Sequence, residues 1–147
     1  MSSKPKIIIV DDCQIFRQGL VSIINLEQIA TVYGEASNAI EFMELLTQLN
    51  PDLVLLNIDM SGMNVINATK MALGLFPLLK IVVYSSYGNE IDFTEMITLG
   101  VKGFILKSCG INEVEKAIVQ VMKGENYFPS RYVKNLSADS DRKYLKN

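Results

Sequence analysis

Polar residues stand at several points of this 147-residue chain where a short apolar run gives way to a loop. Asp11 and Asp12 follow "KIIIV", Asn57 closes "DLVLLN", Ser85 closes "KIVVYS", and Lys107 closes "GFILK". Carboxylate oxygens suit Mg²⁺, which takes one or two carboxylates and keeps several waters. A hydroxyl and an ammonium suit the oxygens of a phosphoryl group. The set therefore predicts a divalent metal beside a phosphate.

Each of these residues also has a purely structural interpretation. Asp11 or Asp12 could cap the helix that follows, although two successive caps are not needed. Ser85 alone could be an ordinary loop residue, and a lysine such as Lys107 is by default solvated. The position of Lys107 directly after an apolar strand favours an inward side chain. The ordered set, with each member closing a different strand, is what makes the pattern specific.

Five apolar runs, alternating with amphipathic stretches, must position these residues. The predicted strands are Lys6–Val10, Ala30–Ala36, Asp52–Asn57, Lys80–Ser85 and Gly103–Lys107. Runs made almost entirely of Ile, Val and Leu are typical of strands buried on both faces of a parallel sheet. Strict β–α alternation predicts a doubly wound α/β sheet with right-handed crossovers and helices on both faces. Functional sites in such sheets lie at the carboxyl ends of the strands, where the polar set would gather.

The residues that flank the amphipathic stretches agree with helices at these places. Ser37 or Asn38 suits the N-cap of the second helix, and Asn64 suits that of the third. Gly100 and Gly124 suit the left-handed position that follows a helix. We therefore expect a helix after each strand.

Composition excludes several classes of function. The chain has no histidine, which argues against triad hydrolysis and zinc catalysis. A net charge of −2 gives no reason to expect direct binding of nucleic acid or a membrane. Cys13 and Cys109 form no C-x-x-C pair, which favours a reducing compartment. Without a signal-peptide pattern or a membrane-length apolar run, we expect a cytoplasmic protein.

The ordered set resembles the receiver domain of two-component response regulators, in the subgroup with a LuxR-type helix-turn-helix output. The resemblance rests on "IIIVDDCQIFRQGL", "GEASNAIEFMELL", "PDLVLLNIDMSGMN", "VVYSS" and "GVKGFILK". It implies a five-stranded (βα)5, flavodoxin-like fold with strand order 2-1-3-4-5. It also implies a receiver domain over residues 5–128, followed by a C-terminal extension or linker over 129–147.

The resemblance also implies a role for each matching residue. Asp11 and Asp12 would bind Mg²⁺ together with residue 57 and the backbone carbonyl of Asp59. Ser85 would be the hydroxyl that follows the fourth strand, Lys107 the lysine that contacts the phosphoryl group, and Phe104 the aromatic switch residue. On the residues alone, Phe104 within "GFILK" is better interpreted as a core residue.

The phosphoacceptor of the family is an aspartate, and it falls on Asn57. A carboxylate can attack a phosphoryl donor and become an acyl phosphate, whereas a neutral amide cannot. One negative charge is also lost, so we expect Mg²⁺ to bind more weakly than in a three-carboxylate pocket. Ser61, Asn64 and Val65 depart from the family pattern in the same loop.

Three explanations of Asn57 compete. In the first, the chain is a natural pseudo-receiver that signals without phosphate. In the second, it is an engineered Asp→Asn variant of a phosphorylatable receiver. In the third, it is a receiver whose acceptor is displaced to Asp59. The drift of the whole loop favours the first. The third is disfavoured because a loop carboxylate would have to align for in-line attack.

The family resemblance implies a signalling module and no enzyme activity of its own. Its partners would be a sensor histidine kinase or another signalling protein, and a second copy of the chain. The docking surface would comprise the first and fifth helices, or the fourth and fifth with the last strand. Nucleic acid would be bound only through an output domain that these residues do not form, and no membrane contact is expected.

Two other classes are less well supported. A haloacid-dehalogenase-type phosphatase also uses D-x-D after a strand, but the first position of "NID" is the amide Asn57. A flavin-binding module shares the topology, but "DDCQIFRQG" offers two carboxylates that would repel the flavin phosphate. The receiver-like module therefore remains the preferred interpretation.

Overall fold

The computed structural model of the protein describes residues 4–86 and 90–130, and they form a parallel five-stranded sheet in the order β2-β1-β3-β4-β5. The strands are β1 (Lys6–Val10), β2 (Thr31–Ala36), β3 (Leu53–Asn57), β4 (Lys80–Ser85) and β5 (Gly103–Leu106). This topology confirms the predicted fold. Three predicted strands were one residue too long, at Ala30, Asp52 and Lys107, because the strand ends depend on ladder hydrogen bonds that the residue pattern does not show.

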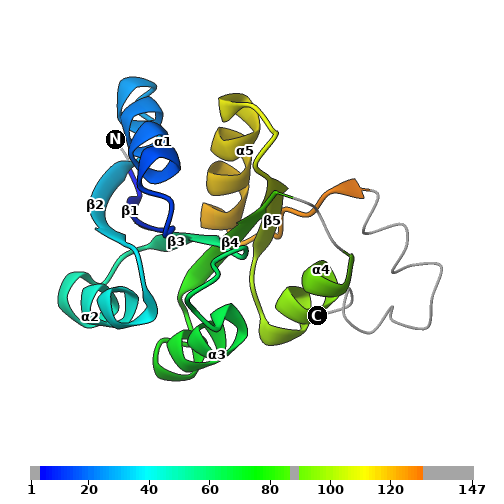
Figure 1. Ribbon diagram of the computed structural model, residues 1–147. Helices are drawn as coiled ribbons and strands as arrows, with labels where there is room; N and C mark the ends of the chain where they lie inside the picture. The colour runs from blue at the N-terminus through cyan, green and yellow to red at the C-terminus, as the bar shows by residue number, and fades with distance from the viewer. Residues whose placement is uncertain (1–3, 87–89, 131–147) are drawn as a thin grey trace.

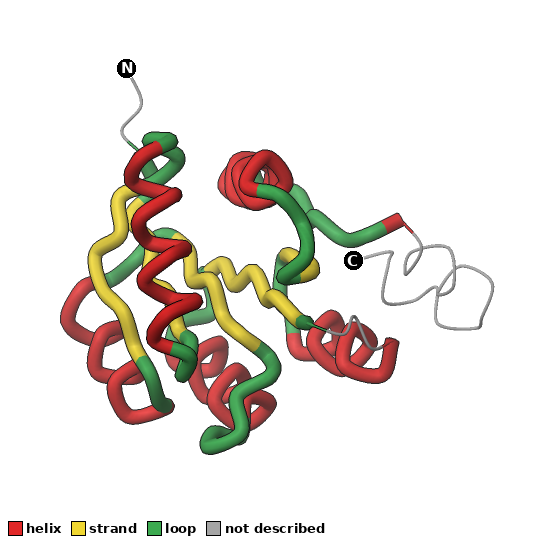
Figure 2. Tube along the Cα trace, turned by 45° about the horizontal axis from the view of Figure 1, so that its top comes forward, coloured by secondary structure: helices red, strands yellow, loops and turns green. Residues whose placement is uncertain are grey.

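A helix follows each strand. The helices are α1 (Gln14–Leu26), α2 (Ala39–Leu49), α3 (Val65–Leu75), α4 (Glu90–Leu99) and α5 (Ile111–Met122). Figure 1 shows α1 and α5 on one face of the sheet and α2, α3 and α4 on the other. In the tilted view of Figure 2 the strands lie between these two groups of helices. None of the described helices has the length and apolar composition that a bilayer crossing requires.

The central strands supply both layers of the core. Ile7 and Ile9 of β1 pack in the layer under α1 and α5, whereas Ile8 and Val10 pack in the layer under α2, α3 and α4. All residues of β3 are buried. Because successive side chains of a strand point to opposite faces, a strand covered on both sides is apolar throughout. This explains the continuous Ile, Val and Leu runs in the sequence.

The structure confirms the predicted starts of α2 and α3 and the predicted ends of α4 and α5. The Asn38 and Asn64 side chains each accept a hydrogen bond from the backbone N–H three residues later, at 2.9 and 3.0 Å. Asn38 is thus the cap of α2, which the sequence alone left open between two residues. Gly100 and Gly124 have φ of 106° and 92°, the left-handed backbone predicted after α4 and α5.

The segment that follows α5 pairs with the open edge of β5. Tyr127 forms an isolated parallel bridge with Gly103. Its carbonyl accepts from the Phe104 N–H at 2.9 Å, and its N–H donates to the Lys102 carbonyl at 2.9 Å. Figure 1 shows this segment, in orange, running beside β5. The pairing covers part of a sheet edge that would otherwise present unpaired backbone groups. Most of the predicted extension, residues 131–147, lies outside the described residues.

Candidate functional site

The Asp11 carboxylate, just past β1, is fully buried and surrounded by hydrogen-bond donors. Its Oδ1 accepts from the Cys13 N–H at 2.9 Å and from Asn57 Nδ2 at 3.0 Å. Its Oδ2 accepts from the Tyr84 hydroxyl at 2.8 Å, and the Lys107 ammonium lies 4.0 Å from the same oxygen. A buried carboxylate is tolerated when donors and a positive charge compensate for lost water, and this one has both.

Helix α1 is tied to the site through Arg17. One guanidinium nitrogen of Arg17 donates to the Asp11 backbone carbonyl at 2.6 Å, and Nε donates to Glu35 on β2 at 2.8 Å. This bridge fixes the start of α1 against the ends of β1 and β2, and with it the backbone that carries Asp11.

Asn57 is the last residue of β3 and only 2% exposed. Its Oδ1 accepts from the Asp59 N–H at 3.0 Å while its Nδ2 donates to Asp11. Turning the amide over would place two oxygens opposite each other and two N–H groups opposite each other. The orientation of the amide is therefore fixed by its neighbours at both ends.

Tyr84 belongs to this site although sequence reasoning did not select it. It lies on β4 in register with Asn57, and its hydroxyl reaches Asp11. Burial, followed by the negative charge of Asp11, raises the pKa of Tyr84 well above its usual range, so the hydroxyl stays protonated and donates. A sequence signal did exist: a phenol within a strand buried on both faces must find a polar partner.

Lys107 follows β5 and points into the site, as its position in the sequence predicts. Its ammonium lies 4.8 Å from the ring centroid of Phe16 and 5.6 Å from that of Tyr84, and its side chain is 19% exposed. Its backbone N–H donates to the Ser85 carbonyl at 2.8 Å. Two aromatic rings and the Asp11 carboxylate thus hold the positive charge.

The remaining predicted residues lie around this cluster. Asp12 is exposed, whereas Ser85 is fully buried at the end of β4. One carboxylate oxygen of Asp59 accepts from the Ser86 N–H at 2.6 Å, which links the β3–α3 loop to the end of β4. The structure thus brings Asp11, Asn57 and Lys107 into one cluster and leaves Asp12 on the solvent side.

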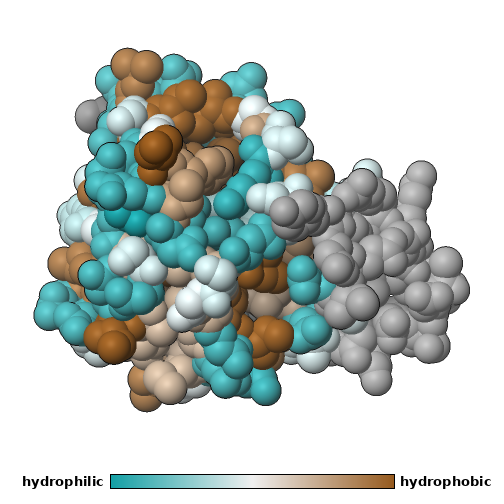
Figure 3. Space-filling model, in the orientation of Figure 1, coloured by the Kyte–Doolittle hydropathy of each residue, from teal (hydrophilic) through white to brown (hydrophobic). Residues whose placement is uncertain are grey.

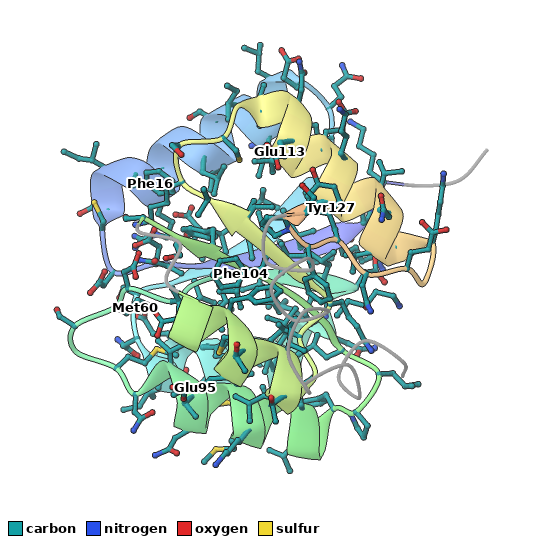
Figure 4. All side chains as sticks on the ribbon, turned by 90° about the vertical axis from the view of Figure 1, so that its right-hand side faces the viewer. Phe16, Met60, Glu95, Phe104, Glu113 and Tyr127 are labelled. Atoms are coloured by element: carbon teal, nitrogen blue, oxygen red, sulfur yellow. The ribbon has the colours of Figure 1, made fainter. Side chains whose placement is uncertain are left out.

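Phe104, the predicted switch position, is a core residue. It is fully buried and packs edge-on against Phe93 of α4, with ring centroids 5.3 Å apart. Phe93 in turn packs edge-on against Phe128, at 5.5 Å, beyond α5. Figure 4 shows Phe104 between the sheet and α4. A row of aromatic rings thereby connects β5, α4 and the segment after α5.

The residues of the cluster do not fit a divalent cation. Three donors and an ammonium surround the Asp11 carboxylate, and Asn57 turns N–H toward it rather than oxygen. Magnesium instead requires oxygen ligands that are free to coordinate. Among the described residues, no three His, Cys, Asp or Glu side chains gather closely enough to hold a metal.

A second feature is an apolar groove between α1 and α5, with a volume of about 300 Å³. Its lining includes Ile15, Gly19 and Ile23 of α1 and Val114 of α5. Ile15 is 86% exposed, and Leu26 at the end of α1 is 77% exposed. Figure 3 shows apolar side chains gathered at the top of the molecule, where α1 and α5 lie in Figure 1. Exposed apolar residues therefore line this groove.

Comparison with known proteins gives consistent results. The family description "response regulator receiver domain" matches residues 7–119. The nitrate/nitrite response regulator NarL of Escherichia coli K12 is 34% identical over 119 residues, which cover 81% of this chain and 55% of that protein. The signal receiver domain of the putative response regulator NarL from Mycobacterium tuberculosis superposes with a TM-score of 0.76 at 26% identity, covering 84% of this chain and all of that one.

A structure described as two RcsB dimers bound to two parallel DNAs superposes with a TM-score of 0.80 at 22% identity, covering 90% of this chain and 69% of that one. At this identity the likeness shows the fold alone. The chain spans between 55% and 63% of the length of the first curated relatives that it matches.

Proposed function

The chain belongs to the response regulator receiver domain family, and on that premise we propose that it is a two-component signalling module that works without phosphorylation of residue 57. Receiver domains are signalling modules, and the output of this one would pass through its surface to a partner. The observation that carries the proposal is the Asn57 amide, which closes β3 and donates to the buried Asp11. By resemblance to the family, residue 57 would be the phosphoacceptor.

The proposed chemistry follows from the amide. An acyl phosphate requires a carboxylate oxygen as nucleophile, and Asn57 offers an amide oxygen that is already engaged by the Asp59 N–H. By resemblance to the family, Ser85 and Lys107 would contact a phosphoryl group, and Phe104 would be the switch residue. Magnesium binding would be weak, because the site has lost one carboxylate and its remaining buried carboxylate is engaged by donors.

We propose the α1–α5 face as the surface through which the module acts, with a second copy of the chain as its occupant. The exposed apolar residues Ile15 and Ile23, the groove beside them and the half-exposed Val119 of α5 support this choice. RcsB, a protein of the same fold, is described as dimeric. A sensor kinase or another signalling protein would be the alternative partner, and nucleic acid would be contacted only through a separate output domain.

Intact-mass analysis after incubation with acetyl phosphate and Mg²⁺ tests the central proposal. The chain as it stands should gain no phosphoryl group. Asn57→Asp, which restores a carboxylate, is the matched variant, and Asn57→Asp combined with Lys107→Ala controls for labelling outside the site. Labelling of the unchanged chain would refute the proposal and direct attention to Asp59.

The Asn57→Asp variant also shows whether the rest of the site is competent. Labelling of that variant would mean that one amide silences a competent site, whether the change is natural or engineered. Absence of labelling in both proteins would mean that the drifted loop has lost the chemistry, which a single engineered change would not cause.

A further inference from the structure

The Asp11 carboxylate is fully buried, and its partners leave little room for another ligand. A carboxylate offers about four acceptor positions. The Cys13 N–H, the Asn57 amide and the Tyr84 hydroxyl occupy three of them at 2.8 to 3.0 Å. The Lys107 ammonium lies 4.0 Å from Oδ2 and supplies the compensating positive charge. The carboxylate is thus satisfied within the protein itself.

Two of these donors come from neighbouring strands and meet Asp11 from different sides. Asn57 ends β3 and bonds Oδ1, whereas Tyr84 lies opposite it on β4 and bonds Oδ2. Each donates N–H or O–H, and a cation at Asp11 would need both to turn away. Displacing them would leave two buried polar groups without partners, which costs free energy.

The Tyr84 ring also helps to place the positive charge. Phe16 and Tyr84 pack with ring centroids 5.6 Å apart, and the Lys107 ammonium lies over both rings. The phenol therefore touches both charged groups: its hydroxyl bonds the carboxylate and its ring faces the ammonium. A divalent cation next to Asp11 would in addition meet the charge of Lys107, which like-charge repulsion disfavours.

We propose that Tyr84 and Asn57 together take the place of a divalent cation at Asp11, so that this receiver holds its acidic site in a fixed, metal-independent arrangement. Tyr84 is the positioning residue: its hydroxyl occupies the oxygen that a cation would need. The inference deepens the proposed function, since it explains how the module keeps its site intact without phosphate chemistry. It also predicts that removing the two donors together opens a cation site.

Titration with Mg²⁺ alone tests the inference. Calorimetry measures the binding of Mg²⁺, and a separate series of thermal unfolding curves measures the midpoint at each Mg²⁺ concentration. The proteins are the unchanged chain, Tyr84→Phe, Asn57→Asp and the double variant. Tyr33→Phe removes a phenolic hydroxyl from a side chain that is 45% exposed on β2 and serves as the matched control. The unchanged chain and Tyr33→Phe should show no saturable binding at millimolar Mg²⁺. The double variant should bind Mg²⁺ about 10- to 100-fold more tightly than Asn57→Asp.

Two results would overturn the inference: saturable millimolar binding by the unchanged chain, or equal Mg²⁺ affinity of Asn57→Asp and the double variant. If the double variant does not fold without Mg²⁺, recovery of its folding on addition of Mg²⁺, measured by circular dichroism, carries the test, because a cation at Asp11 would then replace both lost donors. No recovery would count against the inference. Acetyl phosphate labelling of the unchanged chain would refute the proposed function instead, so the two failures are distinguishable.

Discussion

Nδ2 of Asn57 lies 3.0 Å from Oδ1 of Asp11, and the two side chains are 2% and 0% exposed. The amide is therefore a structural partner of the carboxylate. A carboxylate at position 57 would place two negative charges at hydrogen-bond distance in a buried site, where like charges repel strongly. The amide makes the site stable in the absence of a cation.

Asn57→Asp should lower the free energy of unfolding by about 1 to 3 kcal/mol in the presence of a chelator, because it removes a buried donor and adds a like charge. Urea unfolding followed by circular dichroism measures the loss. Asn64→Asp makes the same chemical change at an exposed N-cap and should cost little, because aspartate also caps helices. Equal losses in the two variants would contradict the buried amide–carboxylate pairing.

Ile15→Glu should weaken self-association of the chain at least about tenfold, because it places a charge on the exposed apolar side of α1. Sedimentation equilibrium over a range of protein concentrations measures the dissociation constant. Ile40→Glu on α2, where the isoleucine is 73% exposed, is the matched control and should have no effect. A strictly monomeric parent chain, or equal effects of both changes, would argue against the α1–α5 face.

Phe128→Ala should loosen the segment that pairs with β5, since the ring packs edge-on against Phe93. The aromatic contact contributes about 0.5 to 1.5 kcal/mol. The Phe104 amide, which donates to the Tyr127 carbonyl, should exchange its hydrogen faster as a result. Hydrogen exchange measured by NMR reads this amide directly.

Tyr127→Phe is the companion to that experiment. It removes the hydroxyl that donates to Glu113 at 3.1 Å but keeps the ring and the backbone pairing, and Figure 4 shows Tyr127 and Glu113 close together. Exchange of the Phe104 amide should change less than in Phe128→Ala. Unchanged exchange in Phe128→Ala would mean that the segment is held by its backbone hydrogen bonds alone.

Asp92→Asn should stabilise the protein at neutral pH and have little effect in strong acid. Burial, followed by the negative charges of Asp59 and Glu95, raises the pKa of Asp92 above its usual 3.8. A raised carboxyl pKa means that the folded state binds the proton more tightly, so stability falls as pH rises from the unfolded-state pKa through the folded-state pKa. Since Asp92 is only partly buried, the gain at neutral pH should be about 0.5 kcal/mol.

Urea unfolding of Asp92→Asn and the parent chain at several pH values checks this sign. The difference in unfolding free energy between the two proteins should grow as pH rises above 4. Glu44→Gln on α2, where the carboxylate is exposed, controls for the loss of one negative charge. A gain that is the same at every pH would show that the ionisation of Asp92 is not its cause.

The sequence by itself determined the fold and most of the membership of the site. Continuous apolar runs identify strands buried on both faces, and their alternation with helices requires a parallel sheet. Parallel strands bring their carboxyl ends to one edge, so Asp11, Asn57 and Lys107 could be expected to meet. Local signals also fixed helix ends at Asn64, Gly100 and Gly124, because caps and left-handed positions depend only on neighbouring residues.

Only the tertiary structure decided which groups touch. Tyr84 and Asp11 are 73 residues apart, and their hydrogen bond depends on the register of β4 against β3 and of β3 against β1. Sequence periodicity does not encode that register to within one residue, and a shift of one would turn Tyr84 to the other face of the sheet. The direction of the Asn57 amide and the pairing of Tyr127 with β5 depend in the same way on hydrogen bonds between distant segments.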